Sequence, residues 1–214
     1  MKLAYLVLAM LGAGLITGCT NLPRSRDLAN PNVSAVTLAQ QVCSNCHGIT
    51  GNSVSPIFPN LAAQPQAYLI GQLKGFKSHG REDPAGFEYM WGVSRSLTDE
   101  QITGLASYYA NQRLARQPIE GNASDMPAGE TIFKSGMAAE NVPACFACHG
   151  DAGQGNETFP RIAGQHADYI VKQLNVFQRT NERPLGAVMK TVAHELTPED
   201  IKDLAAYLQA LPNR

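Results

Sequence analysis

Apolar residues recur at helical spacing in two segments that lie about 101 residues apart. In each segment they occupy positions i, i+4 and i+7, the spacing that places side chains on one face of an α-helix. These residues are Leu69, Leu73 and Phe76 in the first segment, and Ile170, Leu174 and Phe177 in the second. The pattern predicts one amphipathic helix in each segment, with its apolar face turned toward a core.

Two later segments carry helix-start signals in addition to an apolar stripe. Thr98 is followed by Gln101 at the spacing of a capping box, and Thr197 is followed by Pro198, which suits the first helical position. The stripes that follow are Ile102, Leu105, Ala106 and Tyr109, and then Ile201, Leu204, Ala205 and Leu208. The sequence lacks the alternating runs that predict strands. The predicted fold class is therefore all-α.

These helical segments belong to a repeat that covers most of the chain. The sequence CSNCHG at 43–48 matches CFACHG at 145–150, and FPNL at 58–61 matches FPRI at 159–162. The offset between matched positions falls from 102 to 101 and finally to 99, as small loop insertions would produce. We therefore predict a tandem duplication. Its parts are domain one at residues 35–112, a linker at 113–126 and domain two at 127–214.

The composition and net charge argue against one class of partner, nucleic acids. The chain has 214 residues, of which 44% are hydrophobic and 16% are charged, and its formal net charge is −1. This length is enough for two small domains that each bury a modest core. Nucleic-acid-binding domains present a strongly basic surface, and this chain has no such excess of Lys and Arg. We expect no nucleic-acid partner.

The first residues are typical of an export signal. Lys2 precedes an uncharged, mostly apolar run that is too short for a convincing membrane span. The run ends in Ile16-Thr17-Gly18-Cys19, which resembles the lipobox of bacterial lipoproteins. This resemblance implies a signal peptide at 1–18, a lipid on Cys19 and a tether at 19–34. The alternative is ordinary cleavage near an unmodified cysteine. Lipidation would anchor the protein to a membrane outside the cytoplasm.

The remaining cysteines form two Cys-x-x-Cys-His motifs, and three chemistries compete for them. Structural zinc sites bring two cysteine pairs together within 15 to 20 residues, whereas these pairs are about a hundred residues apart. A thioredoxin-like redox pair follows a strand in a βαβ pattern, which the sequence lacks. The third chemistry is covalent attachment of c-type haem, in which two thiols bind the porphyrin and the histidine reaches the iron. We expect two such haems, held by Cys43, Cys46 and His47, and by Cys145, Cys148 and His149.

In these motifs the sequence resembles the class I cytochromes c, and specifically the dihaem cytochrome c4 family. The resemblance covers nearly the whole chain after the signal peptide, through the doubled haem motif, the proline loop, a later methionine and a closing amphipathic helix. It implies two tandem class I cytochrome c domains, each with a few helices around one covalently bound haem. It also implies that the carbonyl groups of Pro59 and Pro160 accept a hydrogen bond from the Nδ1–H of the two histidines.

The second axial ligand follows from the position of the methionines. After the signal peptide, domain one contains a single methionine, Met90, which lies 43 residues after His47. Met189 lies 40 residues after His149, at the matching place in domain two. A methionine at helical spacing more often fills a core, but the match between the repeats favours iron ligation by both. Met126 and Met137 precede the haem motif and have no counterpart in domain one.

Other polar residues give weaker signals. The histidines His79, His166 and His194 have no histidine counterpart in the other repeat, so we expect them to be solvated or satisfied in a core. Arg81 and Arg183 precede the two methionines. They either face solvent or pair with haem propionates, and the sequence alone does not separate these alternatives.

Two six-coordinate irons leave no open position for a substrate, so the expected function is electron transfer rather than catalysis. The resemblance implies a carrier in a periplasmic respiratory chain, with a quinol-oxidising complex as donor and a terminal haem–copper oxidase as acceptor. One alternative is an electron-transfer subunit of a dehydrogenase, such as a sulfide-oxidising flavocytochrome. A dihaem enzyme such as a peroxidase is the other alternative, and it would need a vacant iron.

Overall fold

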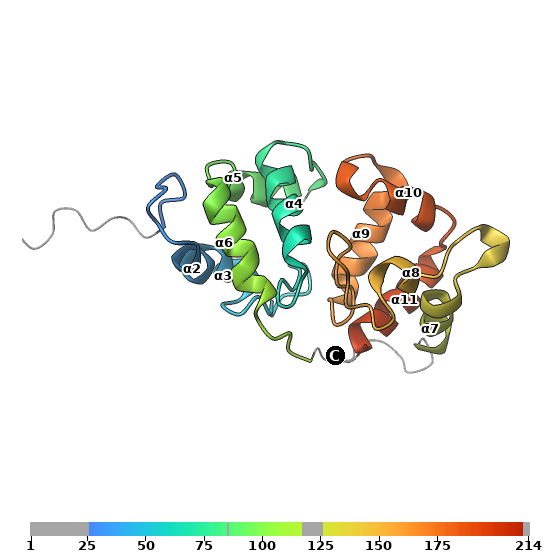
Figure 1. Ribbon diagram of the computed structural model, residues 1–214. Helices are drawn as coiled ribbons and strands as arrows, with labels where there is room; N and C mark the ends of the chain where they lie inside the picture. Colours follow the sequence, from blue (N-terminus) through green and yellow to red (C-terminus); the bar gives the residue numbers. More distant parts are fainter. Residues whose placement is uncertain (1–25, 85, 117–125, 212–214) are drawn as a thin grey trace, which may run out of the picture.

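The computed structural model describes residues 26–84, 86–116 and 126–211. Its described part is helical, with isolated bridges at Met137–Val142 and Asn156–Phe159 but no strands within these ranges. Two helical domains lie next to each other, with domain one in blue to green and domain two in yellow to red (Figure 1). The all-α prediction is confirmed for the described residues. Cys19, the signal peptide and residues 117–125 of the linker fall outside them.

Domain one begins with a short helical stretch that leads into the first Cys-x-x-Cys-His motif. In chain order the elements are α2 (Ala35–Leu38), the π-helix η1 (Ala39–Cys43), α3 (Ser44–His47), α4 (Gln66–Lys77), η2 (Gly86–Trp91), α5 (Gly92–Ser94) and α6 (Asp99–Ala110). Its later elements include a π-helix, η2, which packs against α4 and α5.

Domain two repeats this order with differences in its short elements. The motif again lies on a short helix, followed by two long helices with a shorter one between them. In chain order the elements are α7 (Met126–Ser135), the 3₁₀ helix η4 (Ala138–Glu140), α8 (Phe146–His149), α9 (Ala167–Arg179), the 3₁₀ helix η5 (Pro184–Gly186), α10 (Val188–Ala193) and α11 (Pro198–Ala210).

The predicted helix signals are present in the structure. Thr98 accepts a hydrogen bond from the backbone N–H of Gln101, whose side chain accepts one from the Thr98 N–H, at 3.1 and 3.0 Å. Thr197 forms a second capping box with Asp200, and Pro198 occupies the first turn. Satisfying these backbone groups fixes the start of α6 and α11. Both helices then turn their predicted apolar stripes into a core.

Each domain has its own hydrophobic core, built mainly between its long helices. In domain one the stripe of α6 packs against α2 and α4. In domain two α11 packs against α7 and α9. The buried residues of α4 and α9 include Leu69 and Phe76, and Ile170, Leu174 and Phe177. Within the described residues no helix is both long and apolar enough to span a bilayer.

The two domains meet through matched loops that follow the proline positions. The Asn60 backbone N–H donates to Gln165 Oε1 at 2.8 Å, and Gln165 Nε2 donates back to the Asn60 carbonyl at 3.0 Å. The repeat-related pair does the same, since the Arg161 N–H donates to Gln64 Oε1 and Gln64 Nε2 donates to the Arg161 carbonyl. This reciprocity is the signature of a two-fold related interface. All four residues are buried.

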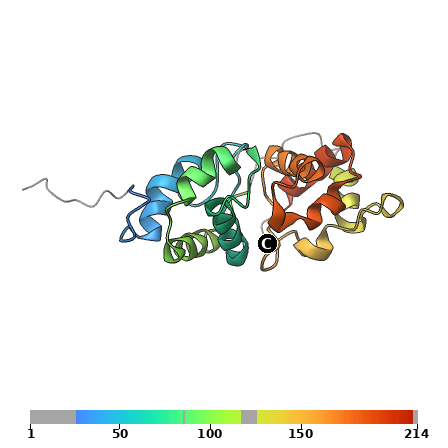
Figure 2. The same ribbon diagram turned by 90° about the horizontal axis from the view of Figure 1, so that it is seen from above.

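A cluster of buried polar side chains extends the same interface between α4 and α9, which lie side by side at the centre of Figure 1 and are seen from above in Figure 2. Arg81 donates to Gln72 of its own domain at 2.7 Å, and Arg183 donates to the same Gln72 Oε1 across the interface at 3.2 Å. Both guanidinium groups also contact Gln173 Oε1.

The negative charge of this cluster comes from domain one, where Asp83 lies beside Arg81. Asp83 is fully buried and pairs with Arg81 at 2.6 Å. Burial alone would raise the pKa of Asp83, but hydrogen bonding to Arg81 and the charges of Arg81 and Arg183 lower it below its usual range. Leu185, which follows Arg183 at the spacing at which Asp83 follows Arg81, carries no charge and is exposed. Arg81 and Arg183 are thus interface residues, and the expectation that they could face solvent was wrong.

Candidate functional site

Each Cys-x-x-Cys-His motif occupies one turn of a short helix. Cys43 ends η1 and directly precedes α3, which carries Cys46 and ends at His47. Cys145 is the N-cap of α8, which carries Cys148 and ends at His149. Residues three and four apart lie on the same helical face, so each turn presents two thiols and an imidazole on one side. All four thiols are free.

A glycine after each histidine lets the chain turn away from the motif. Gly48 and Gly150 have φ angles of +74° and +83°, a region that residues with a side chain adopt at a cost. A Cβ atom at Gly48 would lie 2.3 Å from the Asn52 carbonyl oxygen. The glycine therefore allows the loop to return beneath the histidine and reach the proline at its end.

The two histidines are held in the orientation that an axial ligand requires. Nδ1 of His47 lies 2.9 Å from the Pro59 carbonyl oxygen, and Nδ1 of His149 lies 2.8 Å from that of Pro160. Since a carbonyl only accepts, each Nδ1 carries the proton and each Nε2 keeps its lone pair. Burial lowers the pKa of both imidazoles, and the carbonyl contacts only partly offset this. A neutral imidazole with a fixed ring is the form that binds a metal.

The first cysteine of each motif lies in apolar surroundings. Cys43 packs beside the core of domain one and Cys145 beside that of domain two. Burial raises the pKa of Cys43 and of Cys145 to about 11, so both thiols remain protonated at neutral pH. Reactive redox cysteines and zinc thiolates have a lowered pKa instead. The two pairs also lie in different domains, on α3 and α8 (Figure 1).

Apolar side chains near both motifs remain exposed. The largest of these are Ile49 and Ile57 in domain one, and Phe146 and Phe159 in domain two, which are between 37% and 61% exposed. Exposed apolar groups of this size around a site are a common mark of a ligand surface. A planar, apolar porphyrin attached at the thiols would cover such side chains. The residues of both motifs therefore fit the group that their spacing predicts.

The two methionines lie in the helical segments before the last helix of each domain. Met90 is part of η2, and Met189 is in α10; both are half-buried. In domain one the Phe58 ring contacts both His47 and Tyr89, at centroid distances of 6.2 and 6.4 Å, and so links the histidine to the segment that carries Met90. In domain two Met189 and Cys145 pack against the same core.

The three histidines outside the haem motifs are either buried with a hydrogen-bond partner or exposed, as the sequence predicted. His166 is buried and its Nε2 lies 3.0 Å from the Ser53 carbonyl oxygen across the domain interface. His194 is exposed beside Glu195, with 2.6 Å between Nδ1 and Oε1. His79 is exposed, and its ring packs against Trp91 at an interplanar angle of 46°. Within the described residues, no group of three or more His, Cys, Asp and Glu side chains is arranged to hold a metal ion.

The interface residues were missed by sequence reasoning, although a signal was present. Gln64 and Gln72 of the first repeat recur as Gln165 and Gln173 of the second. A glutamine kept at matched positions can serve both partners of a two-fold interface, since its amide group donates and accepts. The role of these glutamines is evident only from the contacts that they make across the domain interface.

The family model described as cytochrome c matches the chain twice, at residues 34–112 and at residues 127–212. The chain belongs to the cytochrome c family. A cytochrome c-552 from Acidithiobacillus ferridurans is 41% identical over 79% of this chain and 73% of its own length. The solved structure of cytochrome c4 from Acidithiobacillus ferrooxidans has a TM-score of 0.73 and 40% identity, and covers 79% of this chain and 98% of its own.

These findings place the chain in the dihaem cytochrome c4 group, as its motifs suggested. The predicted cofactors, two covalently bound c-type haems, are thereby confirmed, and so is the general role of electron carrier. A further relative is named thiosulfate dehydrogenase electron acceptor, from Thiomonas intermedia. It is 33% identical over 79% of this chain and 78% of its own length.

Proposed function

We propose that each motif attaches one haem and that each domain closes its iron with histidine and methionine. The attachment residues are Cys43 and Cys46 in domain one, and Cys145 and Cys148 in domain two. The axial pairs are His47 with Met90, and His149 with Met189. The observation that carries this assignment is the Nδ1 contact to a proline carbonyl, which occurs in both repeats at nearly the same distance.

The residues of this chain prepare the site for electron transfer without large movement. A c-type haem, when bound, supplies an iron that takes up and releases one electron. Pro59 and Pro160 fix the imidazole rings through Nδ1. The apolar surroundings of Cys43 and Cys145 keep water away from these two thiols. Two thioether bonds to one helical turn keep the cofactor in register with the histidine. A thioether ligand favours the reduced state and raises the potential.

We further propose that the protein works in the bacterial periplasm, tethered to a membrane by a lipid on Cys19. Its place would be between a quinol-oxidising complex and a terminal oxidase, with redox proteins as partners on both sides. The lipobox-like sequence before Cys19 supports the anchor. The similarity to cytochrome c4 supports the role of a general carrier.

A second candidate is that the protein accepts electrons from one dedicated dehydrogenase. The relative named as a thiosulfate dehydrogenase electron acceptor favours this alternative. Both candidates use the same closed irons, so they differ only in the donor. Purified protein should separate them: rapid reduction by quinol in membranes indicates a respiratory carrier, and reduction only by a purified dehydrogenase with its substrate indicates the alternative.

Carbon monoxide binding distinguishes a carrier from an enzyme. If both irons are closed by methionine, the reduced wild-type protein should bind carbon monoxide slowly and incompletely at both haems, because the thioether must leave first. Stopped-flow absorbance of the purified dihaem protein measures this directly. Rapid binding at one haem of the wild type would show a vacant iron, and would favour a peroxidase-like enzyme over the carrier.

The lipid anchor makes a separate prediction. Replacing Cys19 by Ser should remove the lipid-bearing thiol, so the protein should appear in the soluble periplasmic fraction or accumulate with its signal peptide uncut. Fractionation followed by haem staining, with mass spectrometry of the N-terminus, measures both outcomes. The haem spectrum should not change. Wild-type protein that is already soluble, with an N-terminus that carries no acyl chain, would contradict the anchor.

A further inference from the structure

The segment that carries Met90 is built differently from the segment that carries Met189. Between histidine and methionine the chain is three residues longer in domain one, 43 against 40. Met90 lies in the π-helix η2, whereas Met189 lies in the α-helix α10. π-helical turns are uncommon and occur often at functional sites. The longer segment of domain one therefore needs contacts that hold it in place.

An aromatic cluster supplies such contacts on the residue that follows Met90. Trp91 is the only tryptophan of the chain, and its ring lies 4.4 Å from the His79 ring and 6.3 Å from the Phe87 ring, measured between centroids. Phe87 is nearly parallel to it, at 10°. The Arg95 guanidinium lies over the indole at 5.1 Å. We call these four residues the Trp91 cluster. Aromatic and cation–π pairs add to the energy of burial.

His79 reaches this cluster through an unusual backbone conformation. It follows the C-cap of α4 with a φ angle of +57°, a region that glycine normally occupies at the end of a helix. The matching residue in domain two, Thr180, is extended, with a φ angle of −134°. The chain thus leaves the two helices in different directions. Only in domain one does this exit place a ring against the methionine segment.

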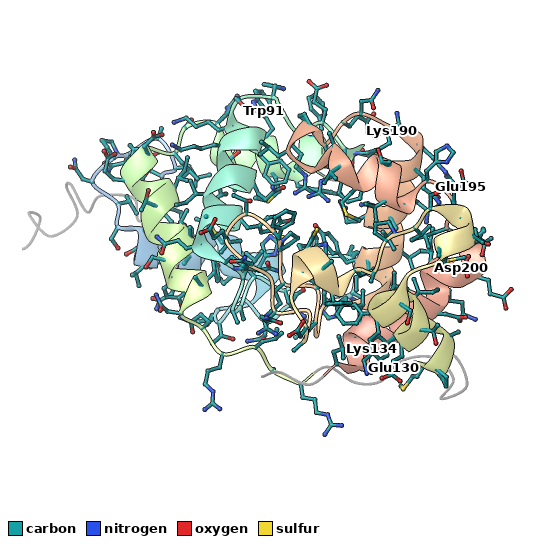
Figure 3. All side chains as sticks on the ribbon, turned by 45° about the vertical axis from the view of Figure 1, so that its right-hand side comes forward. Trp91, Glu130, Lys134, Lys190, Glu195 and Asp200 are labelled. Carbon is teal, nitrogen blue, oxygen red and sulfur yellow. The ribbon has the colours of Figure 1, made fainter. Side chains whose placement is uncertain are left out.

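Domain two has a different arrangement at the position that follows its methionine. Lys190 stands there, and its Nζ donates to Asn181 Oδ1 at 2.8 Å. Figure 3 labels Trp91 and Lys190 along the same edge of the molecule, one on each domain. On the inner side, Ser94 Oγ donates to the Met90 carbonyl at 2.6 Å, whereas Ala193 takes the matching place in domain two.

We propose that Trp91 is a positioning residue for Met90. Its ring, held by His79, Phe87 and Arg95, fixes the outer side of η2, while the Ser94 hydroxyl fixes the Met90 backbone. The thioether of Met90 is thereby kept directed into domain one and resists displacement. This inference rests on the proposed ligation by Met90. It predicts that the two haems lose their methionine ligand with different ease, because of side chains that lie outside both haem-attachment motifs.

The test compares Trp91→Leu and Trp91→Phe with Lys190→Leu, the matched control in domain two. The oxidised dihaem protein is mixed with cyanide, which binds the iron only when methionine leaves. Trp91→Leu should raise the cyanide rate of one haem about tenfold, the factor that corresponds to about 1.4 kcal/mol, and weaken the sulfur-to-iron absorption band. Trp91→Phe should restore most of the wild-type rate, because it keeps a stacking ring. Lys190→Leu should leave both rates unchanged.

His79→Gly is a second variant that separates stacking from backbone strain. Glycine accepts the positive φ angle without cost, so the fold should be kept while the ring over Trp91 is lost. The cyanide rate of the same haem should rise about threefold, a smaller effect because Phe87 still stacks on Trp91. This variant also serves if Trp91→Leu fails to fold.

Met90→Ala provides the reference that separates this inference from the ligand assignment. If Met90→Ala opens one haem to cyanide but Trp91→Leu and His79→Gly behave like wild type, the positioning role is refuted and the ligation stands. A Trp91→Phe variant as fast as Trp91→Leu also refutes it, since stacking would then not be the cause. If Met90→Ala changes neither the band nor the cyanide rate, the ligation itself is wrong.

Discussion

Replacing Cys145 and Cys148 together by Ala is expected to leave the purified protein with one covalent haem instead of two. The two thiols lie on one face of the turn at α8 and are the only free thiols described near His149. Without thioether bonds the second haem is held only by its axial ligands and apolar contacts, which acid acetone disrupts. Covalent haem per polypeptide, measured by mass spectrometry after this extraction, should fall to about half.

The matched variant in domain one strengthens this prediction. Replacing Cys43 and Cys46 by Ala should also leave one haem, and it should be the haem attached to the other domain, as a tryptic haem-peptide map would show. Since each domain has its own core, loss of one haem should not remove the other. Two covalent haems in either variant would overturn the attachment sites.

Much of the fold was predictable because the helix-start signals and the apolar stripes mark the same segments as helices. The capping box at Thr98 and the stripe that follows it describe one helix, and the structure confirms both. The repeat then doubles the information, because each weak pattern in one domain can be checked in the other. Such agreement between local and global preferences is what allows a helix to be read from sequence.

The domain interface could not be derived in this way. The sequence predicted two domains joined by a linker and gave no contact between them. In the structure Asn60 binds Gln165 across the interface. Gln72 accepts hydrogen bonds from both Arg81 and Arg183. Polar residues of loops carry no periodicity, so nothing in the pattern marks them as buried. Their partners are also about 100 residues away, and a contact at that separation depends on how two finished domains dock.

The candidate site shows the same division between local and tertiary information. The thiols and the histidines follow from two short Cys-x-x-Cys-His motifs. The role of the proline carbonyls was implied by the family resemblance, and the two Nδ1 contacts agree with it. The aromatic cluster around Trp91 was missed, because it depends on the positive φ angle of His79. In the sequence, the different distance from histidine to methionine, 43 residues in domain one and 40 in domain two, was a sign that the two methionine segments are built differently.

Replacing Met90 or Met189 by Ala is expected to change one haem strongly in each case. If both thioethers bind iron, the oxidised wild type shows a weak sulfur-to-iron band near the red end of the visible spectrum. Each single variant should then lose about half of that band, and the affected potential should fall by on the order of 0.1 V, a fraction of the range that axial ligands span. Spectroelectrochemical titration of each variant measures both quantities.

Met137→Ala is the matched control, because Met137 is also a half-buried methionine that packs against the core of domain two. It should lower stability slightly, since a core side chain is shortened, but leave the band and both potentials as in wild type. The unaltered domain should keep its own ligand in every variant, although the shared interface can transmit a small shift in potential. A full band in Met189→Ala, together with wild-type carbon monoxide kinetics, would mean that another group closes that iron. Loss of half the band in Met137→Ala would identify Met137 as the ligand instead, and would show that the match between the repeats had misled the assignment.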